Sequence, residues 1–447
     1  MNDERIDLYK QFEKINYIDP SYYEKFRVKR GLRNADGTGV LAGMTNISNV
    51  HGYLLSDSDK LPDEGSLRLR GYEITDLLGE ESSTTRFSFE EVAYLLLLGE
   101  LPTRDQLDTF IAAIDAQREL PDGFTASMIL KDTPPDIMNV LARSILLLYA
   151  YDPDAEDRSP EHEINTAISL MSRVPRMMVL TYYAQQARYH NGSMIMHRFI
   201  PGQSTAETIL SMLRPNREFT PEEARMLDVM LCLHAEHGGG NNSTFTTRVM
   251  SSADTDPYSV YAAAICSLKG KKHGGANHQV RAMQADIKQH VSNWEDDDEV
   301  ADYLAKIVNK QAYDKSGLVY GMGHAVYTLS DPRAIICKKY AKKLAEGTEF
   351  EAEYRLLESI ERLAPEVILR ERGTKKDMCA NIDMYSGFVY SMMGIPEDLY
   401  TPLFACARMA GWAAHRFEEI VAGKRIIRPA YKSTRSGSRP YTPISER

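Results

Sequence analysis

Helical periodicity recurs along most of this chain and leaves little room for other regular structure. Segment after segment carries apolar residues every three or four positions, and most of these segments begin with Pro, Ser or Thr, which favour helix N-termini. The predicted helices cover residues 4–14, 88–99, 103–118, 135–149, 160–190 (broken near Pro175), 204–213, 221–234, 258–267, 295–310, 331–346, 350–363, 365–372, 385–393 and 402–422. Strand-like alternation is hard to find, so the sequence predicts an all-α fold.

The predicted helix ends follow from local chemistry. In residues 88–99, Ser88 is the expected N-cap, glutamates occupy the first turn, and Gly99 ends the helix. The acidic run over residues 295–299 could suggest a metal site. It is better explained as a helix start, because the helix dipole stabilises carboxylates at the N-terminus. From residue 424 the chain is basic, rich in Ser and Pro, and expected to be irregular.

Composition limits the classes of function and the location. The chain has 447 residues, enough for two or three domains, and its net charge of −10 disfavours a nucleic-acid surface. The five cysteines are scattered and lack a C-x-x-C pair, as expected for reduced thiols rather than a disulfide frame or a zinc site. No secretory signal or bilayer-spanning apolar run is found. We therefore expect a cytoplasmic protein with no nucleic-acid and no membrane partner.

The stretch LKGKKHGGANHQV, residues 268–280, is the strongest candidate for a functional site. His273 stands directly before two glycines, which fit poorly in a helix and allow positive φ or close approach to a ligand. The preceding segment is rich in alanine and reads as a buried helix that ends here. We expect His273 on a tight turn at a helix end, where exposed backbone N–H groups favour chemistry over packing.

Two more histidines lie beside glycine-rich turns. His237 precedes three glycines in LHAEHGGGNNSTFTTR, and His324 follows Gly-x-Gly in GLVYGMGHAVYTLSDPRA. His234 and His237 have a spacing that could bind a metal on a helix face, but no third ligand is apparent and no metal site is predicted. Each histidine could instead cap a turn or pack into the core. Arg333 follows in the Ser-Asp-Pro turn that begins the next helix.

An aspartate and an arginine complete the set. Asp383 precedes an apolar helix in NIDMYSGFVYSMMG, where an N-cap aspartate bonded to the N–H of Tyr385 or Ser386 is the simpler explanation. Arg408 lies among alanines and a glycine in TPLFACARMAGWAAHRFEE, so its buried guanidinium needs a carboxylate from the protein or from a substrate. Together these groups suit removal of a proton beside a carbonyl and binding of a dicarboxylate.

These segments resemble the citrate synthase family. KHGGAN, GMGHAVYTLSDPRA, NIDMYSGFVY…GIP and FACARMAGWAAHRFEE occur in the family's order and spacing, and LRLRGYEITDL and FEEVAYLLLLGELPT resemble its N-terminal half. The resemblance covers roughly residues 60–430. It implies an all-α homodimer with shared active sites, each in the cleft between two domains of one subunit. The large helical domain would comprise residues 1–276 and 389–447, and the small one, residues 277–388, would close over the substrates.

The resemblance also implies a role for each candidate. His273 would hydrogen-bond the thioester carbonyl of acetyl-CoA, Asp383 would take the methyl proton, and His324 would polarise and protonate the carbonyl of oxaloacetate. The other oxaloacetate contacts would be His237, Arg333, Arg408 and, from the partner subunit, Arg428, which could otherwise be an ordinary surface charge. Lys375 and Lys376 are candidates for coenzyme A binding. No cofactor is implied, because acetyl-CoA is a substrate.

The implied activity is synthesis of citrate from acetyl-CoA, oxaloacetate and water, a step of the tricarboxylic acid cycle. One alternative is 2-methylcitrate synthase, which uses propionyl-CoA, because one methylene changes discrimination by only about 1–3 kcal/mol and leaves no trace in the motifs. Another is a metal-dependent hydrolase or lyase built on His234 and His237. A third is a non-catalytic helical scaffold, which would tolerate replacement of His273, His324 or Asp383, and all three are present.

Overall fold

The chain is described by a computed structural model over residues 15–34, 36–56, 59–79, 86–373, 377–435 and 437–446. Its contacts divide it into two units, residues 1–42 with 427–447 and residues 43–426. In its described part the first unit contains the short helices α2 (Ser21–Lys25), η1 (Arg30–Leu32) and η6 (Ile444–Glu446). In its described residues the tail after residue 424 is irregular apart from η6, as predicted. The helix predicted over residues 4–14 lies outside the described residues.

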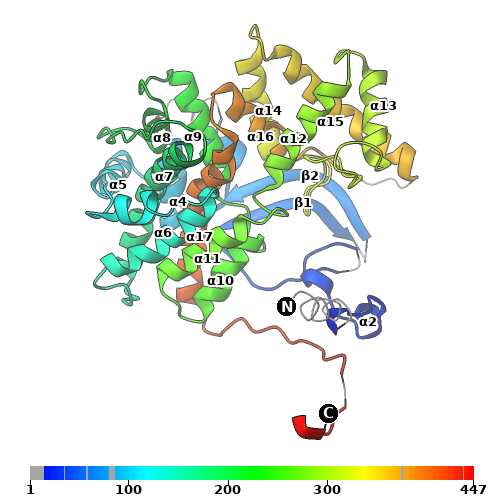
Figure 1. Ribbon diagram of the computed structural model, residues 1–447, viewed down its shortest axis with the longest axis horizontal. Coiled ribbons are helices and arrows are strands. Elements are labelled where there is room, and N and C mark those ends of the chain that lie inside the picture. Colours follow the sequence, from blue (N-terminus) through cyan, green and yellow to red (C-terminus); the bar gives the residue numbers. More distant parts are fainter. Residues whose placement is uncertain are drawn as a thin grey trace. The chain divides into compact units, whose positions relative to one another are not determined.

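The second unit is mainly helical, and the all-α prediction is confirmed (Figure 1). Before residue 270 its helices are α3 (Ile74–Leu77), α4 (Ser88–Leu98), α5 (Arg104–Ala116), η3 (Thr125–Leu130), α6 (Ile137–Leu148), η4 (Tyr149–Tyr151), α7 (Pro160–Tyr189), α8 (Thr205–Leu213), α9 (Pro221–Ala235), α10 (Asn242–Ser252) and α11 (Pro257–Leu268). After it come α12 (Ala276–His290), α13 (Asp297–Val308), α14 (Pro332–Ala345), α15 (Glu351–Arg372), α16 (Asp383–Met392), η5 (Glu397–Leu399) and α17 (Tyr400–Ala422).

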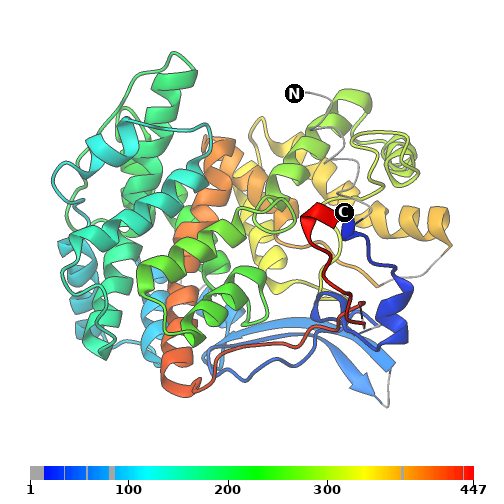
Figure 2. The ribbon, with the colours of Figure 1, turned by 60° about the horizontal axis from the view of Figure 1, so that its bottom comes forward.

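Helix α17 runs through the middle of this unit (Figure 2). It packs against α4, α7, α9, α10 and α11, and its Trp412 is fully buried in the hydrophobic core. The small residues of α17 allow these helices to approach closely. An added Cβ at Gly411 would lie only 2.3 Å from the carbonyl oxygen of Ala235 at the end of α9. The sequence of α17 thus determines how near its polar side chains come to the neighbouring helices.

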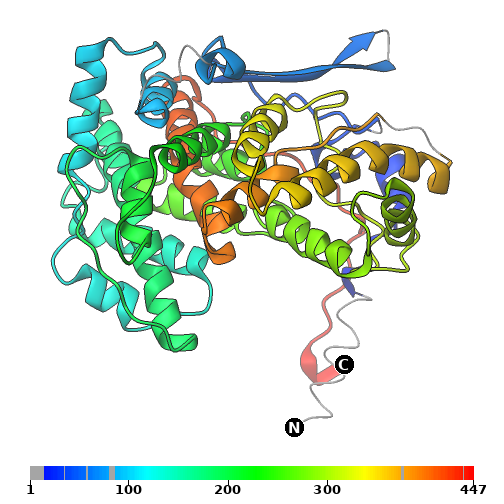
Figure 3. The same ribbon diagram turned by 90° about the horizontal axis from the view of Figure 1, so that it is seen from above.

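Helices α12 to α16 form a second group beside the first (Figures 1 and 3). Within it, α16 packs on α12 and α14, and α15 packs on α13 and α14. The predicted small domain, residues 277–388, contains most of this group, and its boundaries stay a prediction. In the part of the chain that the structure describes, no helix has both the length and the apolar character needed to cross a membrane.

A three-stranded antiparallel sheet was not predicted. Strand β1 (Ser48–Ser56) pairs with β2 (Asp59–Leu69), which pairs with the short β3 (Tyr72–Glu73) beyond a turn at Gly71. In Figure 3 β1 and β2 form a long ribbon above α14. The second strand reads DKLPDEGSLRL, and its Pro, Gly and acidic residues disfavour strands and hide the pattern.

Three predicted helix boundaries are wrong. Ser88 is the first residue of α4 rather than its N-cap, and the carboxylate of Asp228 in α9 accepts from the N–H groups of Ser88 and Phe89 at 3.0 Å. Pro175 does not break α7, and Pro365 does not separate two helices but lies inside α15. A proline inside a helix costs about 3 kcal/mol. Burial of apolar neighbours on both helices offsets this cost.

Candidate active site

His273 lies in the turn between α11 and α12, as the sequence predicts. His273 N donates to Gly270 O at 2.8 Å, and Gly274 N donates to Leu268 O at 2.9 Å, which closes the turn. Gly274 does not adopt positive φ. It is required by space instead, because an added Cβ would lie 2.7 Å from Leu268 O. The HGG sequence therefore lets the backbone pass tightly against the end of α11.

The imidazole of His273 contacts residues from two other helices. Its Nε2 is 3.0 Å from Ser243 Oγ, and the same oxygen accepts from Trp412 Nε1 at 3.2 Å. Its ring meets that of Phe404 edge-on at 6.2 Å. Burial, with a contribution from Arg408, lowers the pKa of His273 to about 4. At neutral pH the ring is therefore uncharged and has one N–H to donate.

His324 lies in the loop before α14. Gly321 and Gly323 have φ of 85° and 84°, a conformation that favours glycine, so the GMGH motif is needed to turn the backbone. Nδ1 of His324 accepts hydrogen bonds from the N–H groups of Val326 and Tyr327 at 3.1 and 3.2 Å. His324 thus caps its own turn. Because Nδ1 accepts, the neutral ring carries its proton on Nε2, which makes Nε2 the donor.

Asp383 is the first residue of α16, and its side chain does not cap the helix. The N–H groups of Tyr385 and Ser386, its expected partners, donate instead to Ile382 O at 3.3 and 3.1 Å. The simpler explanation of this aspartate is therefore wrong. Burial raises the pKa of Asp383 to about 6, although Arg333 acts to lower it. A carboxylate that titrates near neutral pH is suited to act as a general base.

The loop of His324 is joined directly to the segment before α16. Met322 and Ala380 form an isolated antiparallel bridge, and Gly323 N donates to Cys379 O at 2.7 Å. The segments are far apart in the sequence, but these bonds hold the candidate acid and the candidate base on one short two-stranded connection.

His237 follows the end of α9, where Gly238 turns the chain with φ 88°. Its Nε2 is 3.2 Å from Tyr327 Oη, and its ring centroid is 5.0 Å from that of His324. Burial, Arg333 and His324 lower the pKa of His237 well below its usual value, so the ring is neutral at physiological pH.

Arg333 is buried at the start of α14. Its Nε and Nη2 donate to the two carboxylate oxygens of Asp331 at 3.1 and 2.8 Å. The same aspartate caps the helix by accepting from Arg333 N. This bidentate pair fixes the plane of the guanidinium.

The two buried arginines of α17 differ in their partners. Arg416 donates from Nε and Nη2 to the carboxylate of Glu163 at 2.7 and 2.6 Å. Arg408 donates from Nε to His234 O at 2.6 Å, but within the described residues its Nη1 and Nη2 have no hydrogen-bond partner. Burial lowers the pKa of Arg408 to about 10, which still leaves it charged at neutral pH. Two unpaired donors on a buried cation are suited to bind an anion.

The candidate residues also influence one another electrostatically. Arg408 lowers the pKa values of His273 and His237, and Arg333 lowers those of His237 and Asp383. Such coupling needs proximity. The structure therefore brings six sequence-predicted residues together in one place: His237, His273, His324, Arg333, Asp383 and Arg408.

Of the remaining candidates, His234 adjoins this cluster, because its carbonyl oxygen accepts from Arg408 and because burial, Arg408 and Arg333 lower its pKa. The others lie in the first unit or outside the described residues. Arg428 is exposed in the segment after α17 and belongs to the first unit. Lys375 and Lys376 lie outside the described residues. His234 is buried against the Phe404 ring, 4.6 Å between centroids. Across the described ranges, no three His, Cys, Asp or Glu residues come close enough to hold a metal ion, so the hydrolase alternative gains no third ligand there.

Sequence reasoning missed several polar residues at the site. Tyr327 contacts His237 and His324, and Ser243 contacts His273. Glu236 Oε1 accepts from Ser48 Oγ and is 2.9 Å from His415 Nε2. Although burial acts to raise it, the pKa of Glu236 is held at about 2 by His415 and Arg408. The signal in the sequence was the motif HAEH, in which an acid stands between two histidines.

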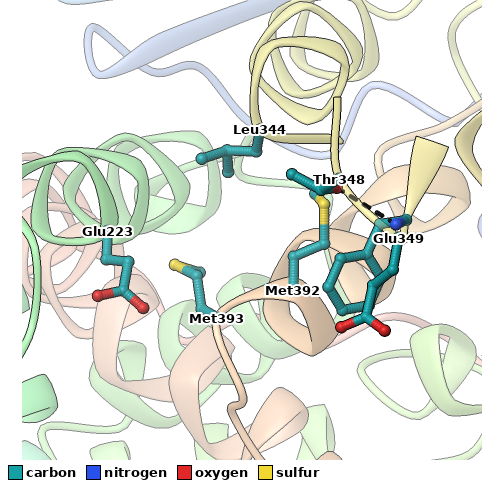
Figure 4. A pocket seen from close by; sticks show the side chains of 7 residues that line it. Glu223, Leu344, Thr348, Glu349, Met392 and Met393 are labelled. Carbon is teal, nitrogen blue, oxygen red and sulfur yellow. Dashed lines mark hydrogen bonds between the residues drawn. The ribbon is translucent and has the colours of Figure 1, made fainter. Parts of the chain in front are cut away.

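A hollow of about 430 Å³ lies elsewhere, among α9, α14, α16 and the connection between α14 and α15 (Figure 4). Its labelled lining residues are Glu223, Leu344, Thr348, Glu349, Met392 and Met393. None of the candidate catalytic or oxaloacetate residues lines it.

The match to known proteins decides the family. The family model "Citrate synthase, C-terminal domain" matches residues 34–430. The chain belongs to the citrate synthase family. It is accordingly an enzyme of the acyltransferase type.

Several citrate synthase relatives align with nearly the whole length of this chain. The citrate synthase of Haloferax volcanii is 34% identical over 94% of this chain and 99% of its own length. The 2-methylcitrate synthase 1 of Corynebacterium glutamicum is 32% identical over the same shares. The solved citrate synthase of Thermoplasma acidophilum, in ternary complex with carboxymethyl coenzyme A and oxaloacetate, has a TM-score of 0.76 at 26% identity and covers 94% of this chain and 99% of its own.

Proposed function

We propose that this enzyme condenses acetyl-CoA with oxaloacetate and water to form citrate and coenzyme A. Family membership supports this activity, and the observation that carries the substrate assignment is the unpaired pair of donors on Arg408. Its Nη1 and Nη2 suit one carboxylate of the diacid bidentately. Arg333 and His237 would be the further contacts, and His324, whose ring centroid is 5.0 Å from that of His237, would donate a proton to the ketone.

Three side chains would share the proton transfers. Asp383 takes a proton from the methyl group of the thioester, while the neutral His273 donates a hydrogen bond to its carbonyl oxygen and stabilises the enolate. The enolate carbon then forms a bond to the ketone carbon of oxaloacetate, and His324 Nε2 gives its proton to the ketone oxygen. Water finally cleaves the thioester of citryl-CoA and releases the free thiol.

The pKa values support this division of roles. A base must be ionised yet basic enough to remove a weakly acidic proton, and a pKa of about 6 for Asp383 satisfies both needs at neutral pH. The hydrogen-bond donor at the thioester carbonyl must stay neutral and keep its N–H as the enolate forms. A His273 ring with a pKa of about 4 is neutral throughout the physiological range.

We further propose a cytoplasmic homodimer in which Arg428 of one subunit completes the oxaloacetate site of the other. The exposed position of Arg428 supports its contact with a partner subunit. The five free cysteines support a reducing compartment, such as the cytoplasm. Residues 277–388 would act as a small domain that closes over the substrates and excludes water. Lys375 and Lys376 remain the candidates for the coenzyme A phosphates.

The test is release of coenzyme A thiol from purified enzyme with oxaloacetate and either acetyl-CoA or propionyl-CoA. We expect a higher kcat/KM for acetyl-CoA. A preference for propionyl-CoA would make this chain a 2-methylcitrate synthase with the same catalytic residues. No oxaloacetate-dependent thiol release with either thioester would overturn the proposed function.

A further inference from the structure

The hairpin of β1 and β2 contains a bulge in which three residues of β2 lie opposite one residue of β1. Pairing runs from Ser48 opposite Leu69 to His51 opposite Ser66, and resumes at Tyr53 opposite Pro62. The residues between Pro62 and Ser66 therefore face Gly52 alone. Extra residues in a bulge have backbone groups that the ladder does not use, and bulges often occur beside active sites.

The bulge binds the loop that follows His324. Asp63 N donates to Thr328 Oγ1 at 3.1 Å, Gly65 N donates to Ser330 Oγ at 2.9 Å, and Thr328 Oγ1 donates to Gly52 O. The backbone groups released by the bulge thus hold the loop between His324 and Asp331.

Two glycines make this contact possible. An added Cβ at Gly52 would lie 2.7 Å from Tyr327 Cα and 3.0 Å from Val326 O. One at Gly65 would lie 2.0 Å from Ser330 O. The strands and the loop touch backbone to backbone, so the position of Tyr327 is set by the hairpin.

Tyr327 in turn contacts three candidate oxaloacetate residues. Its side chain is 2% exposed, and its Oη is 3.2 Å from His237 Nε2. Its ring stacks on His324 at 4.7 Å with an interplanar angle of 28°, and the Arg333 guanidinium carbon is 5.6 Å from the ring centroid.

We propose that the bulge, acting through Tyr327, positions His237, His324 and Arg333 and thereby sets the affinity for the keto diacid. This inference rests on the proposed function for the identity of the ligand. Tyr327 is a positioning residue, because it acts through the three side chains that meet the substrate. Its hydroxyl fixes the His237 ring, and its aromatic face supports the other two.

The first test replaces the hydroxyl alone. Tyr327→Phe keeps the ring and its packing but frees His237 Nε2, so KM for oxaloacetate should rise about tenfold, with KM for the acyl-CoA unchanged and a much smaller change in kcat. The matched control is Tyr258→Phe, because Tyr258 is also buried and donates to Asp152 at 2.7 Å. That variant should leave KM for oxaloacetate unchanged.

The second test displaces the loop that contains Tyr327 and leaves the tyrosine itself unchanged. Gly52→Ala should push the loop away from the hairpin and raise KM for oxaloacetate while lowering kcat, because His324 moves too. Gly43→Ala is the control, since an added Cβ there meets nothing within 4 Å. Thermal unfolding of all four variants identifies any general loss of stability. Equal KM values in Tyr327→Phe, Gly52→Ala and their controls would overturn the inference.

A readout on the ligand-free enzyme separates this inference from the proposed function. The imidazole ¹⁵N shifts of His237, assigned by comparison with His237→Gln, should change in Tyr327→Phe and Gly52→Ala but not in Tyr258→Phe. Unchanged shifts would defeat the positioning role even in an active enzyme. If the wild type releases no thiol and binds no oxaloacetate, the proposed function fails, while shifted His237 signals would still support positioning by Tyr327.

Discussion

Arg408 and Arg416 are two turns apart on α17 and both are buried, yet within the described residues only Arg416 donates hydrogen bonds to a carboxylate. Removing one partner of a buried, hydrogen-bonded ion pair leaves the other charge uncompensated, whereas removing Arg408 breaks no hydrogen bond to a carboxylate within the described residues. Replacing each arginine in turn therefore distinguishes an effect on oxaloacetate binding from an effect on the stability of the fold. Arg408 has two donors that await an anion, and Arg416 supports the packing of α7 against α17.

Arg408→Met should raise the Kd for oxaloacetate by about 100-fold or more, because each charge-assisted hydrogen bond contributes about 1.5–3 kcal/mol. Isothermal calorimetry without acyl-CoA measures it. Arg416→Met is the control. It should lower the free energy of unfolding by about 3–5 kcal/mol and leave the Kd of the remaining folded enzyme unchanged. Equal oxaloacetate affinity in wild type and Arg408→Met would remove the basis of the substrate assignment.

Asp383 should destabilise the empty enzyme. Its folded-state pKa of about 6 lies above the ordinary aspartate pKa of 3.8, so the folded protein binds this proton more tightly than the unfolded chain does. The contribution of Asp383 to the free energy of unfolding therefore falls as pH rises from about 4 to 6. We expect Asp383→Asn to raise the free energy of unfolding by up to about 3 kcal/mol at pH 7.5, and little at pH 4, while turnover is lost. Urea unfolding at both pH values measures this, with exposed Asp398→Asn as control.

The same titration should appear in the kinetics. Only ionised Asp383 accepts a proton, so log kcat/KM for the acyl-CoA should rise with pH and level off above an apparent pKa of about 6. His273, with a pKa of about 4, should add no inflection between pH 5 and 8. A flat profile between pH 5 and 7.5 would contradict the assignment of the base.

At these positions the sequence predicted residue types well and contacts less well. Histidines beside glycines and an arginine among alanines are local patterns, and all of them reached the site. Tyr327 and Glu236 were missed because their importance depends on partners 90 to 188 positions away in the chain. No local pattern distinguishes such a tyrosine from an ordinary core residue.

Among the elements, helices were predicted more reliably than their ends. Periodicity and start signals located α5 and α8, which have the expected Thr and Ser caps, and α9, which has the expected Pro in its first turn. Where a distant side chain replaces the local cap, as Asp228 does for α4, the boundary could not be predicted. The hairpin was missed because its bulge interrupts the alternation of apolar and polar residues that would indicate a strand. The bulge contacts Thr328 and Ser330, which are distant in the sequence.

The turn between α11 and α12 can be tested as an element. Gly274→Ala should displace His273, because the new Cβ would meet Leu268 O at 2.7 Å, and kcat/KM for the acyl-CoA should fall by about 100-fold. Gly270→Ala, in the same turn, is the control. Its Cβ would be 3.4 Å from Ser267 O, an ordinary contact, and activity should be kept. Equal kinetics for the two variants would show that the turn tolerates a side chain.

The proposed dimer predicts complementation between inactive subunits. A His324→Ala subunit keeps its own Arg428, and an Arg428→Ala subunit keeps its own His324. If each site takes Arg428 from the partner, a hybrid dimer contains one intact site and one that lacks both groups. Co-refolding the two inactive variants should therefore restore thiol release, and refolding each alone should not. Absence of recovery in purified hybrids would show that Arg428 is not shared.

The bridge between Met322 and Ala380 connects the backbone beside His324 to the backbone beside Asp383, the residues proposed for the two proton transfers. Because the proposed proton donor for the ketone and the proposed base for the methyl proton lie on one backbone connection, a movement of that connection would displace both groups together. An active site in which Asp383 is in place to form the enolate, but His324 is not in place to protonate the ketone, would thereby be avoided.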